Sequence, residues 1–409
     1  MNIVLEPGAA ALLDELHRAG FGAYAVGGCV RDSLLGLAPH DWDLCTAACP
    51  GQVMELFGED RCIPTGLQHG TVTVKRDGKL YEITTFRTEG RYSDGRHPDS
   101  VAFVPDLRED LARRDFTINA MAYSAEEGLC DPFGGREDLA RGVVRAVGEP
   151  LRRFGEDALR ILRLYRFAAR FGFAIDEATE AAAKQLASRL DCVSAERIEE
   201  ELNKLLAAPQ PGAYLEPEVL AFVLPELPPE GLTKARRRID ALPAGTEQVS
   251  ARWAALLLPL GEAGARKALK RLKCSNARID GVAALVRECG EKTPDAPDRC
   301  DLRLQAKRLL GKYDLHTVQQ LTALWTALAP EEKGSFDALR AEAEALTAQG
   351  VCCRISQLAV NGRDLMAAGA APGPGLRRVL EALLEEVITG RLPNEKTELL
   401  AFAAGFSAS

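Results

Sequence analysis

The sequence lacks the signals that mark secreted and membrane-embedded proteins. No apolar run reaches the roughly 18 residues that a helix needs to span a bilayer, and the first residues have neither the basic start nor the cleavage site of a signal peptide. The eleven cysteines form no C-x-x-C framework, so we expect reduced thiols and neither disulfides nor a structural zinc site. Together these absences predict a cytoplasmic protein without a membrane partner.

Positive charge is also scarce, because the 409 residues carry a net charge of −8. A chain that binds nucleic acid over its whole surface is usually basic, so any such partner must meet a local patch. Residues 231–280 hold eleven Lys or Arg against four acids. Within them Arg266, Lys270 and Lys273 follow i, i+4, i+7 spacing, which predicts one helical face suited to RNA phosphates. Charge alone allows an ordinary solvated helix face equally well.

Strand signals gather in about the first 140 residues. They lie at Tyr24–Val26, Asp41–Leu44, Thr71–Lys75 and Leu80–Thr84, and the last two flank the hairpin signal Asp77-Gly78. From about Gly155 onward the pattern is helical, with Pro-rich interruptions. Since the length exceeds what one hydrophobic core usually organises, we expect an α+β protein with an α/β head and several helical domains.

Two short motifs in the head carry chemistry. Gly27-Gly28, after a strand and before a helix, leaves backbone N–H groups open to a phosphate. Asp41-Trp-Asp43 reads as a strand, on which residues two apart project from one face. Two carboxylates held together without a basic partner favour a hard cation, and Mg²⁺ binds carboxylate oxygens together with substrate phosphates. Two such ions can align an attacking hydroxyl and stabilise leaving pyrophosphate.

The order of these motifs resembles a known family. Gly27–Gly36 with Asp41-Trp-Asp resembles the first motif of the class II branch of the polymerase β-like nucleotidyltransferases, which contains CCA-adding enzymes and bacterial poly(A) polymerases. Four further motifs match in order, and with the first they cover about 200 residues. They begin at Arg113-Arg-Asp-Phe-Thr-Ile-Asn-Ala, Asp131-Pro-Phe-Gly-Gly-Arg, Glu156-Asp-Ala-Leu-Arg-Ile-Leu-Arg and Ala195-Glu-Arg-Ile-Glu-Glu.

The resemblance implies a fold and a set of domains. It implies a polymerase β-like head with a mixed sheet, followed by an all-helical neck, body and tail. The expected divisions are 1–140 for the catalytic head, 141–205 for a neck that holds the nucleotide-selecting helix, and 206–330 and 331–409 for a body and tail that bind tRNA.

The resemblance also implies roles for individual residues. Asp41 and Asp43 are expected to hold catalytic Mg²⁺, while Gly28, Arg31 and Arg114 contact the incoming nucleotide. The remaining nucleotide contacts are expected from Asp157, Arg160, Arg163 and Arg166. Their steps of three along the chain independently predict one slowly turning helical face. Glu82 is a candidate third acid beside the metals, against the alternative of an ordinary exposed strand residue.

A pair of these residues suggests how a nucleotide is chosen without a template. The Asp157 carboxylate can accept from the exocyclic amine of C or A, while the Arg160 guanidinium donates to the adjacent ring nitrogen. Uracil and guanine turn a carbonyl oxygen toward the carboxylate instead. We therefore predict that protein side chains select CTP and ATP.

Several features separate the members of this family. The stretch Pro64–Val74 resembles the CCA-adding version of its strand rather than that of poly(A) polymerases, and Arg87–Pro98 resembles the loop of complete CCA-adding enzymes. Arg252–Gly261 lacks the His-Asp pair of a phosphohydrolase domain, whereas Leu358–Lys396 resembles the tail of the short Bacillus-like enzymes. We expect addition of C, C and A from CTP and ATP to tRNA, with no stable protein partner. An A-only enzyme, a poly(A) polymerase and a non-catalytic tRNA-binding protein remain alternatives.

Overall fold

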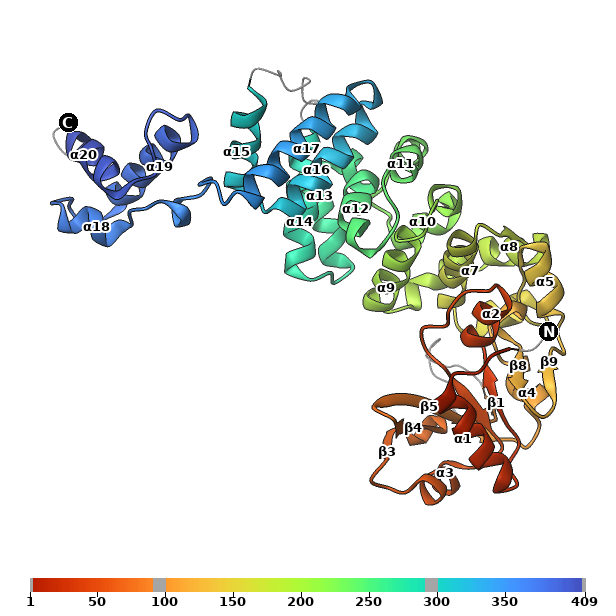
Figure 1. Cartoon of the computed structure of the whole chain (residues 1–409). Coiled ribbons are helices and arrows are strands. Elements are labelled where there is room, and N and C mark those ends of the chain that lie inside the picture. The colour runs from red at the N-terminus through yellow and green to blue at the C-terminus, as the bar shows by residue number, and fades with distance from the viewer. Residues whose placement is uncertain (1–2, 91–100, 291–300, 407–409) are drawn as a thin grey trace. The chain divides into compact units, whose positions relative to one another are not determined.

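The structure is a computed structural model that describes residues 3–90, 101–290 and 301–406. The chain divides into two compact units, Met1–Pro229 with Arg271–Lys273, and Glu230–Lys270 with Cys274–Ser409. All strands assigned in the described residues lie in the first unit, and the second is helical (Figure 1). The expected α+β class with a mixed N-terminal sheet is confirmed.

A seven-stranded sheet organises the head of the first unit. Its order is β3-β4-β5-β2-β1-β8-β9, and only β2 and β5 pair in parallel. The strands are β1 (Ala23–Val26), β2 (Leu44–Thr46), β3 (Cys62–Gly66), β4 (Thr71–Arg76), β5 (Lys79–Thr85), β8 (Ala122–Ser124) and β9 (Gly128–Cys130). β6 (Arg87–Glu89) and β7 (Val101–Phe103) form a separate antiparallel pair, and residues 91–98 of the expected loop lie outside the described residues.

The strand predictions agree with the structure at three of four places. β1, β4 and β5 lie where expected, and Asp77 (φ 49°) and Gly78 (φ 77°) form the hairpin turn between the last two. The prediction for Asp41–Asp43 is wrong, because β2 begins only at Leu44. The three residues of β2 are buried, whereas both acids are exposed, so no apolar burial draws the acids into the sheet.

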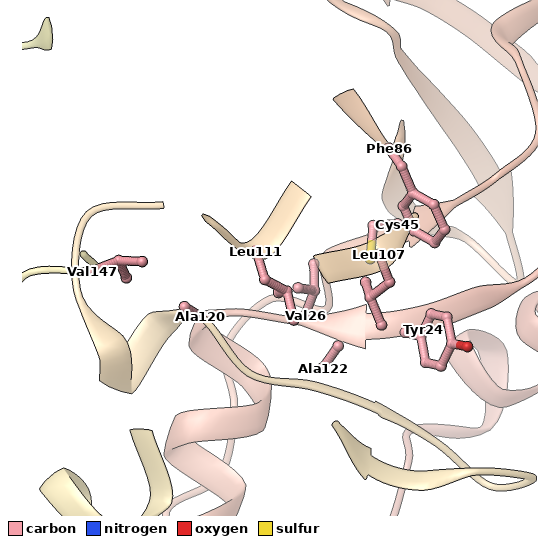
Figure 2. Close-up of a cluster of buried hydrophobic side chains, with 9 residues drawn as sticks. All are labelled: Tyr24, Val26, Cys45, Phe86, Leu107, Leu111, Ala120, Ala122 and Val147. Atoms are coloured by element: carbon pink, nitrogen blue, oxygen red, sulfur yellow. The ribbon is translucent and has the colours of Figure 1, made fainter. Parts of the chain in front are cut away.

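The two faces of the sheet are covered unequally. α1 (Pro7–Arg18) and α3 (Pro50–Phe57) pack on one face. On the other face α4 (Leu107–Ala112) brings Leu107 and Leu111 against a cluster at β1 and β2 (Figure 2). This cluster also contains Tyr24, Val26, Cys45, Phe86, Ala120, Ala122 and Val147. On the same face, the exposed residues of β3, β4 and β5 are not covered by a helix in this way.

Helices complete the first unit. α2 (Gly28–Leu34) follows β1 directly, and α7 (Leu159–Phe171) packs against α9 (Ala195–Leu206). The others are α5 (Gly135–Arg141), α6 (Pro150–Glu156), α8 (Glu177–Gln185) and α10 (Pro217–Val223). A two-residue parallel pair, β10 (Val143–Val144) with β11 (Ala174–Ile175), ties the start of this region to the end of α7, which is a small exception to the expected all-helical neck.

The second unit is built from packed helices and a terminal segment with its own core. Its helices are α11 (Pro229–Ala241), α12 (Val249–Leu257), α13 (Gly261–Arg271), α14 (Asn276–Gly290), α15 (Leu302–Lys312), α16 (Leu315–Leu328), α17 (Lys333–Ala348), α18 (Gly362–Ala367), α19 (Pro374–Ile388) and α20 (Lys396–Phe406). α12, α14 and α16 pack together, and Leu365, Leu383 and Leu399 close a separate cluster in α18 to α20. In the described parts of the chain, no helix has the length and apolar character to cross a membrane.

Candidate active site

A glycine turn joins β1 to α2. Gly27 has φ 77°, a region that favours glycine, and its backbone N–H donates to the Met121 carbonyl at 3.1 Å. A Cβ at this position would lie 2.9 Å from Nη1 of Arg114. The helix begins at Gly28 itself. The turn therefore lets Arg114 pass close to the backbone beside the start of α2.

The two candidate metal ligands lie just before β2. Asp43 extends the line of the strand, because its carbonyl accepts from the Val26 N–H at 2.9 Å. Partial desolvation and the negative charges of Glu82 and Asp41 raise the pKa of Asp43, while Arg114 opposes them. Asp41 is 84% exposed, and its Oδ1 lies 3.2 Å from Nδ1 of His40. The carboxylates thus repel one another and accumulate negative charge directly before the first residue of β2.

Glu82 lies beside Asp43 across the parallel ladder. Because Leu44 pairs with Ile83 and Cys45 with Thr84, the residues one step earlier are Asp43 and Glu82, and both project from the same face. The charge effect on Asp43 agrees with this position. In the described residues, no three His, Cys, Asp or Glu side chains form a ready-made metal-binding group. Glu82 as a third metal ligand stays a prediction.

One cavity of about 620 Å³ collects the candidate site residues of the first unit. Its lining includes every predicted catalytic and nucleotide-binding residue, namely Gly28, Arg31, Asp41, Asp43, Arg114, Asp157, Arg160, Arg163 and Arg166. Gly27, Arg113, Asp115, Asn119, Leu159, Phe167, Arg170, Arg197 and Lys204 complete it. Nine cationic side chains face four carboxylates, so a net positive cavity lies within an acidic protein.

A buried carboxylate fixes the two consecutive arginines at the edge of this cavity. Asp110 has no exposed side-chain surface and pairs with Arg113 at 2.9 Å and with Arg114 at 3.3 Å. Burial raises the pKa of Asp110, but the attraction of these two guanidinium groups outweighs it, so the net shift is downward. Nε of Arg114 is buried without a hydrogen-bond partner. The head thus presents Arg114 beside the acids with an unused donor.

The arginines of α7 are held by carboxylates and aromatic rings. Asp115 accepts from Nε of Arg163 at 2.8 Å, and Glu201 of α9 pairs with Nε of Arg166 at 2.6 Å. Arg166 also lies over the Phe167 ring at 4.0 Å from its centroid, and Arg31 lies 5.1 Å from the same centroid. Arginine can keep its charge when it is half-buried and stacked in this way, so the cavity wall is a pre-arranged row of cations.

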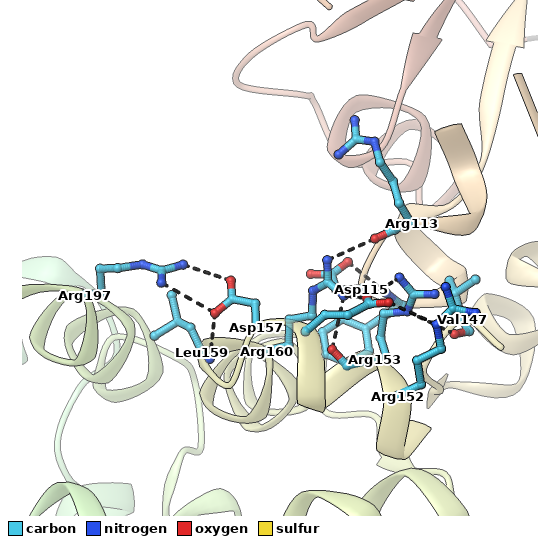
Figure 3. A network of polar contacts seen from close by, with 11 residues as sticks. Arg113, Asp115, Val147, Arg152, Arg153, Asp157, Leu159, Arg160 and Arg197 are labelled. Atoms are coloured by element: carbon cyan, nitrogen blue, oxygen red, sulfur yellow. Dashed lines mark hydrogen bonds and ion pairs between the residues drawn. The ribbon is translucent and has the colours of Figure 1, made fainter. Parts of the chain in front are cut away.

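Asp157 and Arg160 do not form the expected pair. α6 ends at Glu156, Asp157 is extended (φ −136°, ψ 107°), and α7 begins at Leu159, so the prediction of one continuous helical face from Asp157 is wrong. The Asp157 carboxylate caps α7 by accepting from the Leu159 N–H at 3.0 Å, and it accepts from Arg197 at 2.9 Å. Figure 3 shows Asp157 and Arg197 meeting on one side of the network.

Arg160 is turned toward the head. Its guanidinium donates to the Arg153 carbonyl at 3.2 Å, to Glu156 at 2.9 Å and to the Arg113 carbonyl at 3.0 Å (Figure 3). Three of its five donors are therefore already used, and the guanidinium links α6 and α7 to the residue before Arg114. Both Asp157 and Arg160 still line the cavity.

Sequence reasoning missed the groups that hold the arginines. Asp115, Asn119 and Arg197 lie within quoted motifs, yet none was assigned a role. Asn119 accepts from Arg31 and donates to Asp115 at 3.0 Å. Burial pushes the pKa of Asp115 upward, but Arg163 and Asn119 outweigh it and hold the pKa well below its usual range. An acid inside an arginine-rich motif was the available signal, since buried guanidinium groups need carboxylate partners.

The predicted basic face on residues 266–273 is only partly formed. Arg266 and Lys270 lie on α13, but this helix ends at Arg271 and Lys273 has φ 56°, so the prediction of one helical face is wrong for Lys273. Arg266 is paired with Glu262 and Asp280, and Lys273 with Glu196 at 2.7 Å. Lys270 is exposed. RNA binding by these residues stays a prediction.

Three segments of the chain match known protein families. Residues 23–145 match the "Poly A polymerase head domain", residues 172–228 the "Probable RNA and SrmB-binding site of polymerase A", and residues 245–403 the "tRNA nucleotidyltransferase domain 2 putative". The CCA-adding enzyme of Limosilactobacillus fermentum is 38% identical over 408 residues, covering 96% of this chain and 95% of its own. That of Geobacillus stearothermophilus is 37% identical over 403 residues, with coverage of 96% and 95%.

Solved structures agree with this assignment. The crystal structure of the Bacillus stearothermophilus CCA-adding enzyme in complex with CTP matches with a TM-score of 0.82 and 34% identity, covering 99% of this chain and 98% of the other. The Thermotoga maritima CCA-adding enzyme complexed with tRNA matches with a TM-score of 0.67 at 23% identity, covering 98% and 96%, and supports the fold alone.

Proposed function

The chain belongs to the tRNA nucleotidyltransferase/poly(A) polymerase family, and from this membership we propose that it adds C, C and A to the 3′ end of tRNA from CTP and ATP, releasing pyrophosphate. The observation that carries the proposal is the cavity in which a cationic wall and a pair of carboxylates meet. Because the substrate is tRNA, we also propose that the protein acts in the cytoplasm.

The cationic wall suits the triphosphate of the incoming nucleotide. Arg31, Arg163 and Arg166 are fixed by neighbouring carboxylates and rings before any substrate binds. Pre-arranged charges cost little reorganisation when negative charge develops on the leaving pyrophosphate. Arg114 lies between this wall and Asp43, with a buried Nε that lacks a partner. We assign Arg114 to the phosphate nearest the reacting bond.

The carboxylates fit a divalent metal ion. Asp41, Asp43 and the neighbouring Glu82 offer hard oxygen donors, and partial burial together with the negative charges of Glu82 and Asp41 raises the pKa of Asp43. We propose Mg²⁺ held by Asp41 and Asp43, since this ion typically takes one or two carboxylates together with substrate phosphates. When bound, it supplies Lewis-acid stabilisation of the attacking and leaving oxygens. The turned-out side chain of Asp41 must then rotate away from His40.

Selection of the base is assigned to Asp157. Its carboxylate keeps acceptor capacity beyond the bonds from Leu159 and Arg197, and can accept from the exocyclic amine of cytosine or adenine. A carbonyl oxygen of uracil or guanine would face this half-buried acceptor unfavourably. Arg197 fixes the carboxylate in place, while Arg160 has two donors left for a ring nitrogen and also ties the neck helices to the head.

The proposal is tested with three RNA ends and four labelled nucleotides in the presence of Mg²⁺. We expect the sequence C, C, A on tRNA that ends at the discriminator base, A alone on tRNA that ends in CC, and no addition to an unrelated RNA. Addition of A only to the CC end would identify an A-only enzyme. A long A tract on the unrelated RNA would identify a poly(A) polymerase, and tRNA binding without any incorporation would contradict catalysis altogether.

A further inference from the structure

The sheet face that carries Asp43, here called the open face, leaves large side chains exposed on its outer strands, although Thr73 between Ile63 and Glu82 is itself buried. On β3, β4 and β5 the residues facing α1 and α3 are buried, among them Val72, Val74 and Ile83. The alternate residues face the opposite way, and there Ile63 is 43% exposed and Leu80 is 62% exposed. Exposed large apolar residues on a sheet face next to an active site mark a surface that contacts a partner.

The strand register arranges this face in rows that end at the catalytic acids. Ile63 pairs with Thr73, Thr73 with Glu82, and the ladder places Glu82 beside Asp43. The next row starts at Arg61, whose carbonyl accepts from the Lys75 N–H at 2.8 Å.

Lys75 pairs with Leu80. Leu80 lies two residues before Glu82 on β5, just as Asp41 lies two residues before Asp43 ahead of the parallel strand β2. Because side chains two apart share a face, Arg61, Lys75 and Leu80 form a row next to that of Ile63 and Glu82.

Two cations on this face have no acidic partner. Arg61 and Lys75 are exposed, and within the residues that the structure describes neither makes an ion pair. The lysine on the other face of the same hairpin differs, because Lys79 pairs with Glu6 at 2.9 Å. Lys75 on β4 and Arg61 directly before β3 therefore offer free positive charge two and three strands across from β2. Neighbouring strands lie about 4.8 Å apart, so the two cations can meet successive phosphates of a short RNA segment.

This face and the nucleotide cavity lie on opposite sides of the acids. β2 lies between β1 and β5 in the sheet. The cavity extends from Asp43 toward the β1 turn and α7, and the open face extends from Asp43 across β5, β4 and β3. Displacement at a phosphorus atom places the attacking and leaving oxygens in line. Pyrophosphate leaves toward the cationic wall, so the attacking hydroxyl must approach from the side of the open face.

We propose that the open face of β3, β4 and β5 is the seat for the last two or three nucleotides of the RNA primer. Arg61 and Lys75 bind their phosphates, Ile63 and Leu80 contact the sugars and bases, and the terminal 3′-hydroxyl lies at Asp43 and Glu82. The assignment rests on the proposed function, to which it adds the position of the second substrate. Arg61 and Lys75 act as primer-binding residues.

The test compares the double variant Arg61→Ala/Lys75→Ala with wild type and with Lys79→Ala, a matched control on the opposite face of the hairpin. The first readout is C addition to tRNA and to a short RNA hairpin with the same 3′ end. We expect KM for both RNAs to rise about tenfold with KM for CTP unchanged, as for the loss of two phosphate contacts. Lys79→Ala should behave as wild type.

The second readout is binding of the same short hairpin, followed by fluorescence anisotropy at several salt concentrations. The slope of log affinity against log salt should fall by about 1.4 in the double variant, given about 0.7 per phosphate on a single strand. The proposed primer site would be contradicted if the double variant kept the wild-type KM for RNA and the wild-type salt slope. It would also be contradicted if the variant showed weaker addition to full tRNA but normal addition to the hairpin. If the wild-type protein binds the hairpin through Arg61 and Lys75 but adds no nucleotide, the proposed function is wrong while the proposed RNA-binding site is supported.

Discussion

Asp157 and Arg160 are close in sequence but belong to different parts of the network. Asp157 is bonded to Arg197 of α9, and Arg160 to the backbone carbonyls of Arg153 in α6 and Arg113 in the head. A change at Asp157 leaves the bonds between α7 and the head intact, whereas a change at Arg160 removes one of them, the bond to the Arg113 carbonyl. Base selectivity and cavity integrity can therefore be separated by single substitutions.

We expect Asp157→Ala to lose rate with CTP and ATP and to relax the rejection of UTP and GTP. Discrimination should narrow by about one to two powers of ten, taking roughly 1–3 kcal/mol for a base contact. Arg197→Ala should reproduce part of this relaxation because it frees the Asp157 carboxylate. Arg160→Ala should lower kcat/KM for all four nucleotides. The measurement is kcat/KM for the four nucleotides on tRNA that ends before CCA. An equal loss for all four in Asp157→Ala would show that this side chain does not read the base.

The identity of the site residues could be predicted better than their contacts. Every predicted nucleotide-binding residue lines the cavity, because motif positions set which side chains converge. The shared helical face of Asp157 and Arg160 was mispredicted because α6 ends at Glu156 and leaves Asp157 extended. No local signal reveals that Arg197, 40 residues further on, returns to this carboxylate, since packing of α7 against α9 decides it.

Helix α7 owes the position of its row of arginines to acids on other elements. Glu201 lies on α9, and Asp115 lies in the segment between α4 and β8. Removing one partner of a buried ion pair leaves an uncompensated charge, which costs more than the pair itself contributes. The carboxylates that hold α7 are thus needed for stability as well as for the position of the cations.

We expect Asp115→Ala to reduce the free energy of unfolding by about 3–5 kcal/mol at neutral pH. The pKa of Asp115 is lowered in the folded protein, so its contribution is present above the unfolded pKa near 4 and is lost as pH falls toward the folded value. The difference between wild type and variant in denaturant titrations should therefore shrink below about pH 4. A difference that stays constant from pH 7 to pH 3 would show that the charge of Asp115 is not what stabilises the fold.

Strands and helices with a clear period could be predicted, and short irregular segments could not. The β4–β5 hairpin follows from alternation around Asp77-Gly78. Lys273 was placed on a helix by its spacing alone, although α13 ends two residues earlier and Cys274 folds back to donate to the Leu269 carbonyl at 3.0 Å. The ends of elements depend on such tertiary closures, to which sequence periodicity is insensitive.

The acidic balance of the whole molecule makes RNA binding depend on local charge. We expect tRNA affinity to fall steeply with salt, and the triple variant Arg266→Glu/Lys270→Glu/Lys273→Glu to bind at least about tenfold more weakly with a shallower salt slope. The choice of nucleotide should not change. Normal binding by this variant would identify residues 266–273 as a solvated surface, in keeping with the ion pairs of Arg266 and Lys273.

The most direct test of the account is nucleotide addition by Asp41→Asn and Asp43→Asn, measured beside tRNA binding with saturating Mg²⁺. The account assigns both carboxylates to metal and neither to an RNA phosphate. We therefore expect addition to fall at least about 10³-fold, while the dissociation constant for tRNA changes less than about twofold because no phosphate contact is lost. The assignment of catalysis to the acids directly before β2 would be contradicted by either of two results. One is that most of the turnover remains in either variant, and the other is that tRNA binding is lost together with activity.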